Sequence, residues 1–138
     1  MVRFVALGAC AALFTAFFLS QANAEELGID KIMKKLYGKQ KDGSPGTHKA
    51  MVAELEGAAP NWDTLSKQGK TFLELAEALA KTKPEKGEAK SWDKLCKEHI
   101  DQVKAVNAAV GKKDKEAAKA GLTKIKDSCE ACHEHHRD

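Results

Sequence analysis

The sequence predicts an all-α protein and, more specifically, an antiparallel four-helix bundle. The first observation is compositional: Ala, Leu, Lys and Glu dominate and favour helices, whereas the β-branched residues that favour strands are sparse. The second is periodicity. Apolar residues recur at spacings of three and four in segments separated by Gly- and Pro-containing breaks, which is the pattern of amphipathic helices joined by short links.

The start of the chain has the features of a secretory signal peptide. Arg3 supplies a positive charge, an apolar run covers residues 4–19, and Ala22-Asn23-Ala24 is a small-residue cleavage site. An uncleaved membrane anchor is the alternative, but the apolar run is shorter than the roughly 20 residues that a span needs. We therefore expect residues 1–24 to be removed, residues 25–138 to form one domain, and the mature protein to be periplasmic.

Four helical regions are expected in residues 25–138. The Gly- and Pro-containing segment 38–47 interrupts the first, after which Thr47 can cap a short continuation that Gly57 and Pro60 end. The regions begin at residues that suit helix N-termini: Glu25 with Glu26, Asn61, Ser91 and Asp114.

Charge and cysteine content exclude some classes of function. The 23 basic and 20 acidic residues give a net charge of +3, which is too balanced to indicate nucleic-acid binding. Without the signal peptide, Cys96, Cys129 and Cys132 remain. An odd number of cysteines in an exported protein argues against a framework built only of disulfides.

The most informative motif is Cys129-Glu130-Ala131-Cys132-His133. A Cys-x-x-Cys-His run is the attachment signature of c-type haem. Residues three apart lie on one face of a helix, so both thiols can reach one edge of a macrocycle, and the following His133 can bind the iron. Cys129 and Cys132 also continue the apolar stripe of Leu122 and Ile125. We therefore expect one covalently bound haem c, with Cys129 and Cys132 as attachment residues and His133 as the proximal ligand.

Two other interpretations of the cysteine pair are open. A disulfide oxidoreductase places such a pair at a helix N-terminus, whereas this pair lies late in the last helical region. A zinc site could use Cys129 and Cys132 with histidines among His133, His135 and His136. Structural zinc, however, usually draws two ligand pairs from separate segments, and His48 and His99 stand alone.

The segment Ser128–Arg137, at the end of a four-helix chain of this size, resembles the class II c-type cytochromes, which include cytochrome c′ and low-spin cytochrome c556-like proteins. The resemblance implies that Arg137, four residues after His133, lies near the proximal side of the haem. It also implies that Met33 is the distal ligand, as in low-spin members of the family. The sequence departs from the family pattern at His136, where an aromatic residue is usual, and at Ile29, where Arg is common.

The group on the other side of the iron decides between two functions. A Met/His ligand pair suits an electron carrier that is not an enzyme, which is the expected function. The alternative is a five-coordinate c′-type protein that binds small gases, with Met33 packing in the core. His48 and His99 are rival ligands.

Cys96 lies on an apolar stripe and is expected to be a buried thiol, with an intermolecular disulfide as the alternative. The expected partners are redox proteins, with no nucleic acid and no membrane after signal cleavage, and the resemblance implies a homodimer as an alternative to a monomer.

Overall fold

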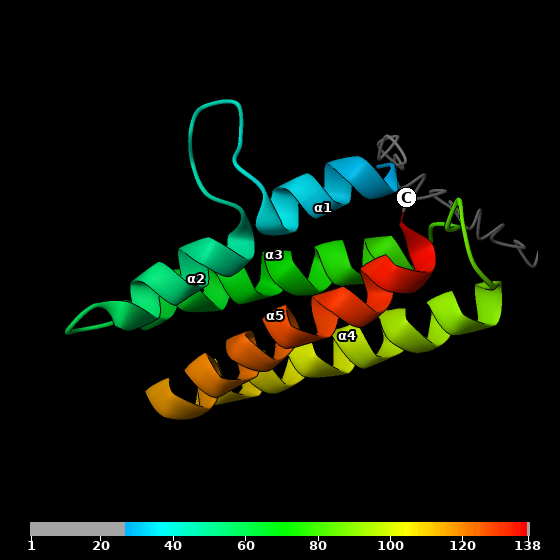
Figure 1. Cartoon of the computed structure of the whole chain (residues 1–138). Helices are drawn as coiled ribbons and strands as arrows, with labels where there is room; N and C mark the ends of the chain where they lie inside the picture. Colours follow the sequence, from blue (N-terminus) through cyan, green and yellow to red (C-terminus); the bar gives the residue numbers. More distant parts are fainter. Residues whose placement is uncertain (1–26, 138) are drawn as a thin grey trace, which may run out of the picture.

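The computed structural model describes residues 27–137, and these residues form five α-helices and no β-strand (Figure 1). The helices are α1 (Ile29–Tyr37), α2 (Thr47–Glu56), α3 (Trp62–Ala80), α4 (Ala89–Gly111) and α5 (Lys115–His136). The expected all-α class is confirmed. The expected signal peptide lies outside the described residues, as do Glu25 and Glu26. The first helix begins later than expected, at Ile29.

The three long helices α3, α4 and α5 follow one another in antiparallel order, and each packs against the next (Figure 1). The short helices α1 and α2 both run opposite to α3. Both pack on α3, but only α2 also packs against α5. Of the two parts of the first helical region, α2 therefore lies beside α5 and α1 does not.

The connection between α1 and α2 is a closed loop over residues 38–46. The N–H of Gly46 donates to the carbonyl of Gly38 over 2.6 Å, which brings the two ends of the loop together. A Cβ on Gly46 would lie 2.7 Å from the carbonyl oxygen of Leu36, so only glycine permits this close approach. The loop therefore interrupts the helix without separating α1 from α2.

Two of the expected helix caps are present and two are wrong. The Asn61 side chain accepts from the Thr64 N–H, and that of Asp114 accepts from the Ala117 N–H, each over 3.0 Å. Ser91 is not a cap, because α4 begins two residues earlier at Ala89. Thr47 is the first residue of α2, and its hydroxyl donates to the carbonyl of Lys35 instead.

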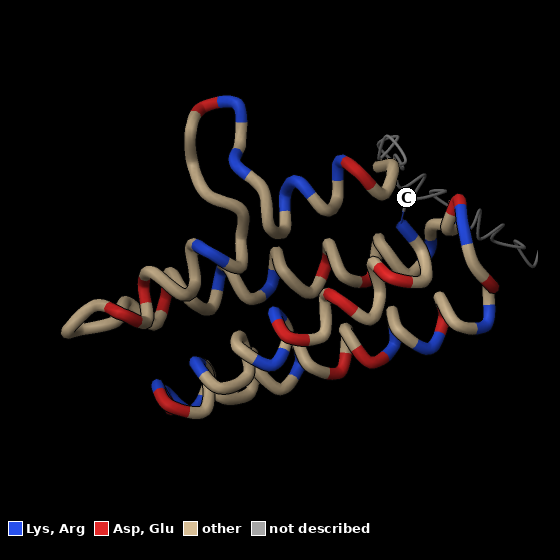
Figure 2. Tube along the Cα trace, in the orientation of Figure 1, with Lys and Arg blue, Asp and Glu red and all other residues tan. Residues whose placement is uncertain are grey.

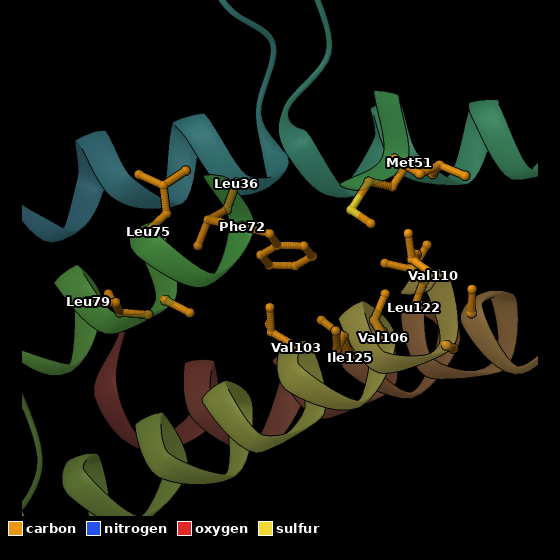
Figure 3. Close-up of a cluster of buried hydrophobic side chains, with 14 of the residues drawn as sticks. Leu36, Met51, Phe72, Leu75, Leu79, Val103, Val106, Val110, Leu122 and Ile125 are labelled. Atoms are coloured by element: carbon orange, nitrogen blue, oxygen red, sulfur yellow. The ribbon is translucent and has the colours of Figure 1, made fainter. Parts of the chain in front are cut away.

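All five helices contribute to one hydrophobic core, of which Figure 3 shows a large part. Phe72 lies at its centre with no exposed surface. Acidic and basic residues alternate along the helices (Figure 2). None of the helices in residues 27–137 is long and apolar enough to cross a membrane.

Candidate functional site

Helix α5 carries the Cys-x-x-Cys-His motif without a break. It begins at the Asp114 cap and buries Ala118, Leu122 and Ile125 against the core. The next two positions of that stripe are Cys129 and Cys132, which are half-buried. The helix ends after the motif, where the N–H of Arg137 donates to the carbonyl of His133 over 3.1 Å. The motif therefore stands on a regular helix that fixes the directions of its side chains.

The two thiols lie on the inner side of α5. Both are free, and Cys132 packs against the core. The Cys129 thiol donates weakly to the carbonyl of Ile125 at 3.5 Å. Burial raises the pKa of both thiols; the Asp127 carboxylate adds to the effect at Cys129, and Cys129 adds to it at Cys132. A disulfide oxidoreductase needs a lowered thiol pKa, so the site lacks the electrostatics for that chemistry.

His133 and Arg137 lie together on the outer side of α5. Both are exposed. With Glu130 and Glu134 they line a shallow depression on the surface. The two residues are one helical turn apart, so they are neighbours at the end of α5.

The register between α4 and α5 follows from two side-chain hydrogen bonds. The Ser91 hydroxyl bonds to His136 Nε2 over 3.1 Å, and the Ser128 hydroxyl donates to the Gln102 side-chain oxygen over 3.2 Å. Because the helices are antiparallel (Figure 1), His99 then lies level with Cys129, and its ring contacts Phe72 of the core at a centroid distance of 5.9 Å. The same register sets Cys96 level with Cys132.

A partly buried hydrogen bond joins α1 to α4. The Tyr37 hydroxyl and His99 Nε2 are 3.3 Å apart. Burial raises the pKa of Tyr37 far above its usual value, and the charges of Cys129 and Cys132 raise it further. Burial lowers the pKa of His99 to about 4, with a smaller contribution from His48. Both side chains of the pair are therefore neutral at pH 7.

Tyr37 was not among the residues that sequence reasoning identified. It is the only tyrosine in the chain and lies four residues after Met33, hence on the same helix face. That spacing was a usable signal. The rings of His48, Phe72 and His99 surround it, with centroids 5.6–6.3 Å from its own.

The three expected candidates for the distal ligand lie in different environments. Met33 is half-buried and packs against the core from α1. His48 is buried, and its Nε2–H donates to the carbonyl of Leu122 over 2.9 Å, away from the motif. His99 lies level with Cys129. Of the two histidines, His99 is therefore the stronger rival to Met33.

His136 has a structural contact that the sequence did not indicate. Its Nδ1–H donates to the carbonyl of Lys86 over 2.8 Å, and its ring meets Trp92 edge-on at a centroid distance of 5.2 Å. A Cβ on Gly87 would lie 2.5 Å from the carbonyl oxygen of His135, so this contact needs glycine there. The imidazole thus packs as an aromatic ring and anchors the end of α5.

Within residues 27–137, no group of three or more His, Cys, Asp or Glu side chains is arranged to hold a metal ion, including the combination weighed for zinc. Comparison with known proteins found no matching family model, no matching curated protein and no matching solved structure.

Proposed function

We propose that this protein is an exported monohaem c-type cytochrome that carries electrons. The observation that carries the proposal is the arrangement of Cys129-Glu130-Ala131-Cys132-His133 on α5. Both thiols are free and half-buried on the inner side of the helix, while the adjacent His133 is free of the core. One covalent haem c would be held by Cys129 and Cys132, with His133 as an iron ligand, and it would supply one-electron exchange at the iron.

The described residues fit such a group. In the first half of α1, Ile29 and Met33 are half-buried apolar side chains, and Cys132 is half-buried on α5. The start of α1 and the end of α5 lie on the same side of the molecule, yet the two helices do not pack on each other (Figure 1). Incompletely buried apolar side chains on both helices suit a large apolar group between them. On this proposal, α1 and α2 are the two halves of the first helix of an antiparallel four-helix bundle.

Met33 is proposed as the distal ligand. Helix α1 runs antiparallel to α5, and Tyr37 contacts His99, which lies level with Cys129. Met33, one turn earlier, therefore lies level with the part of α5 that follows Cys132. A thioether is neutral, so ligation by Met33 requires no buried charge and no release of a proton.

The covalent attachment is tested by intact mass. The protein is exported in a bacterial host with working cytochrome c maturation, purified and denatured before the measurement. We expect the mass of residues 25–138 plus one haem. Cys96→Ala is the matched control and should keep the haem, whereas Cys132→Ala should lose at least one of the two thioether bonds. A denatured chain without haem from such a host would refute the proposal.

The distal ligand is tested by the optical spectrum. The unaltered protein should be low-spin in both oxidation states, and Met33→Ala should become high-spin and bind carbon monoxide readily when reduced. His99→Ala is the comparison variant. If His99→Ala and not Met33→Ala changes the spin state, His99 is the ligand.

The five-coordinate, gas-binding alternative is favoured by one observation, which is that α1 packs on α2 and α3 but not on α5. A high-spin spectrum and free carbon monoxide binding in the unaltered protein would establish that alternative and exclude ligation by Met33.

A further inference from the structure

Cys96 is a third free cysteine, and the proposed haem attachment leaves it without a role. It lies on α4 with 3% of its surface exposed and belongs to the core. Its burial counts against the intermolecular disulfide that the sequence left open.

The register of α4 and α5 places Cys132 opposite Cys96. Ser91 on α4 bonds to His136 on α5. Cys96 lies five residues after Ser91, and Cys132 lies four residues before His136, so the two cysteines are level in this antiparallel pair. Both point toward the core, Cys96 as part of it and Cys132 packed against it.

We propose that Cys96 and Cys132 form a disulfide across the α4–α5 interface before haem is attached. The formation of this bond does not depend on haem. Its consequence rests on the proposed function: a chain oxidised in this way cannot bond haem through Cys132 until the disulfide is reduced.

Helix geometry favours this bond over one between Cys129 and Cys132. Residues three apart on a helix have Cβ atoms roughly 5–6 Å apart, whereas a disulfide needs roughly 3.5–4.5 Å. A bond within the motif would therefore distort α5. Packed helix axes lie roughly 8–10 Å apart with Cα atoms about 2.3 Å from each axis, so the Cα atoms of level residues on two packed helices come within about 3.5–5.5 Å of each other at their closest. That range overlaps the roughly 4.4–6.8 Å of disulfides.

The oxidant would be an exported disulfide oxidoreductase in its disulfide form. The half-exposed Cys132 loses its proton and attacks a sulfur of the oxidant, which gives a mixed disulfide and releases one thiolate of the oxidant. Cys96 then loses its proton and attacks the Cys132 sulfur. The Cys96–Cys132 bond forms, the mixed disulfide breaks, and the oxidant leaves as a dithiol that has gained two electrons and both protons.

Peptide mapping of the haem-free protein tests the proposal. The full chain is exported in a bacterial host that lacks cytochrome c maturation, equilibrated with oxidised and reduced glutathione, denatured and alkylated. We expect Cys129 alone to be alkylated, and the mass before alkylation to be about 2 Da below that of the reduced chain, for the two hydrogens lost. Cleavage after lysine and after Glu130 separates the three cysteines, so the partner of Cys96 can be read directly.

Two variants sharpen the mapping. Cys129→Ala should keep the bond between Cys96 and Cys132, and Cys132→Ala should leave no disulfide that contains Cys96. Alkylation of all three cysteines, a bond between Cys129 and Cys132, a bond between Cys96 and Cys129, or a disulfide-linked dimer would each overturn the proposal. These outcomes are read from the unaltered chain, so they test the proposed disulfide even if a variant folds poorly. If the unaltered chain forms the bond, and Cys96→Ala, which cannot form it, still receives no haem in a competent host, this inference is supported and the proposed function is refuted.

Discussion

Protonation of His99 should destabilise the haem-free protein as the pH falls. Burial lowers the pKa of His99 from 6.5 to about 4 in the folded state. The unfolded chain therefore binds more protons than the folded chain between these two values, and stability must fall as the pH falls through that range. The contribution of His99 is complete above pH 6.5 and lost below about pH 4.

The size of the effect follows from the pKa difference. A shift of about 2.5 units, at about 1.4 kcal/mol per unit, corresponds to about 3 kcal/mol of unfolding free energy. That is a large fraction of the roughly 5–15 kcal/mol by which domains of this kind are stable. The hydrogen bond between Tyr37 and His99 is part of the same buried pair.

Urea unfolding of the haem-free protein at a series of pH values from 7.5 to 4 measures this loss. His99→Gln keeps a polar partner for the Tyr37 hydroxyl but cannot titrate in this range, so the variant should lose about 3 kcal/mol less than the unaltered protein over the range. His135→Gln, at an exposed position of the same helix as the motif, is the matched control. Carboxylates affect all three proteins alike. Parallel pH profiles for the unaltered protein and His99→Gln, or a His99 NMR titration midpoint near 6.5, would refute the reasoning.

Three further predictions concern the core and its anchors. In the native haem-loaded protein Cys96 should resist thiol reagents at pH 8, because it is 3% exposed and burial raises its pKa to about 12; rapid labelling would contradict its place in the core. Gly87→Ala should cost about 1–3 kcal/mol of unfolding free energy, because Gly87 has a φ of +84° and its new Cβ would approach the end of α5. Gly111→Ala is the control and should be close to neutral, because the space around its new Cβ is open. Ile125→Ala should cost roughly 2–5 kcal/mol in thermal or urea unfolding, since Ile125 has no exposed surface, and a loss below 1 kcal/mol for this variant would show that the core is loosely packed there.

The helices could be predicted from the sequence because their signals are local. Asn61 and Asp114 were expected as caps and are caps, since each needs only an N–H three residues ahead. Ser91 was expected for the same reason and is not a cap. Its hydroxyl bonds to His136, which lies far away in the sequence. No property of the segment around Ser91 could have indicated that partner.

The interruption of the first helical region was also predictable, and its consequence was not. Gly and Pro in residues 38–47 indicate a break whatever the rest of the chain does. The two helices on either side of the break pack differently, and this depends on tertiary contacts. Helix α2 packs against α5, whereas α1 packs against α2 and α3. That difference leaves the apolar face around Met33 half-buried, and the proposed haem site depends on it.

In the candidate site, too, the features that depend on spacing along one helix could be predicted from the sequence. The features that depend on the register between two helices could not. The distance of three residues from Cys129 to Cys132 puts both thiols on the same side of any regular helix, and they continue the stripe of Ile125, so their position on the inner side of α5 could be predicted from the sequence alone. The position of His99 beside Cys129 depends on two side-chain hydrogen bonds between α4 and α5, and the position of Tyr37 depends on how α1 rests on α3. Each helix turn advances about 5.4 Å, so a register shifted by one turn would replace the neighbours of both cysteines while leaving every sequence pattern intact. The residues that would attach a haem covalently therefore come from one segment, whereas the side chains that surround those residues are determined by the packing of the whole chain.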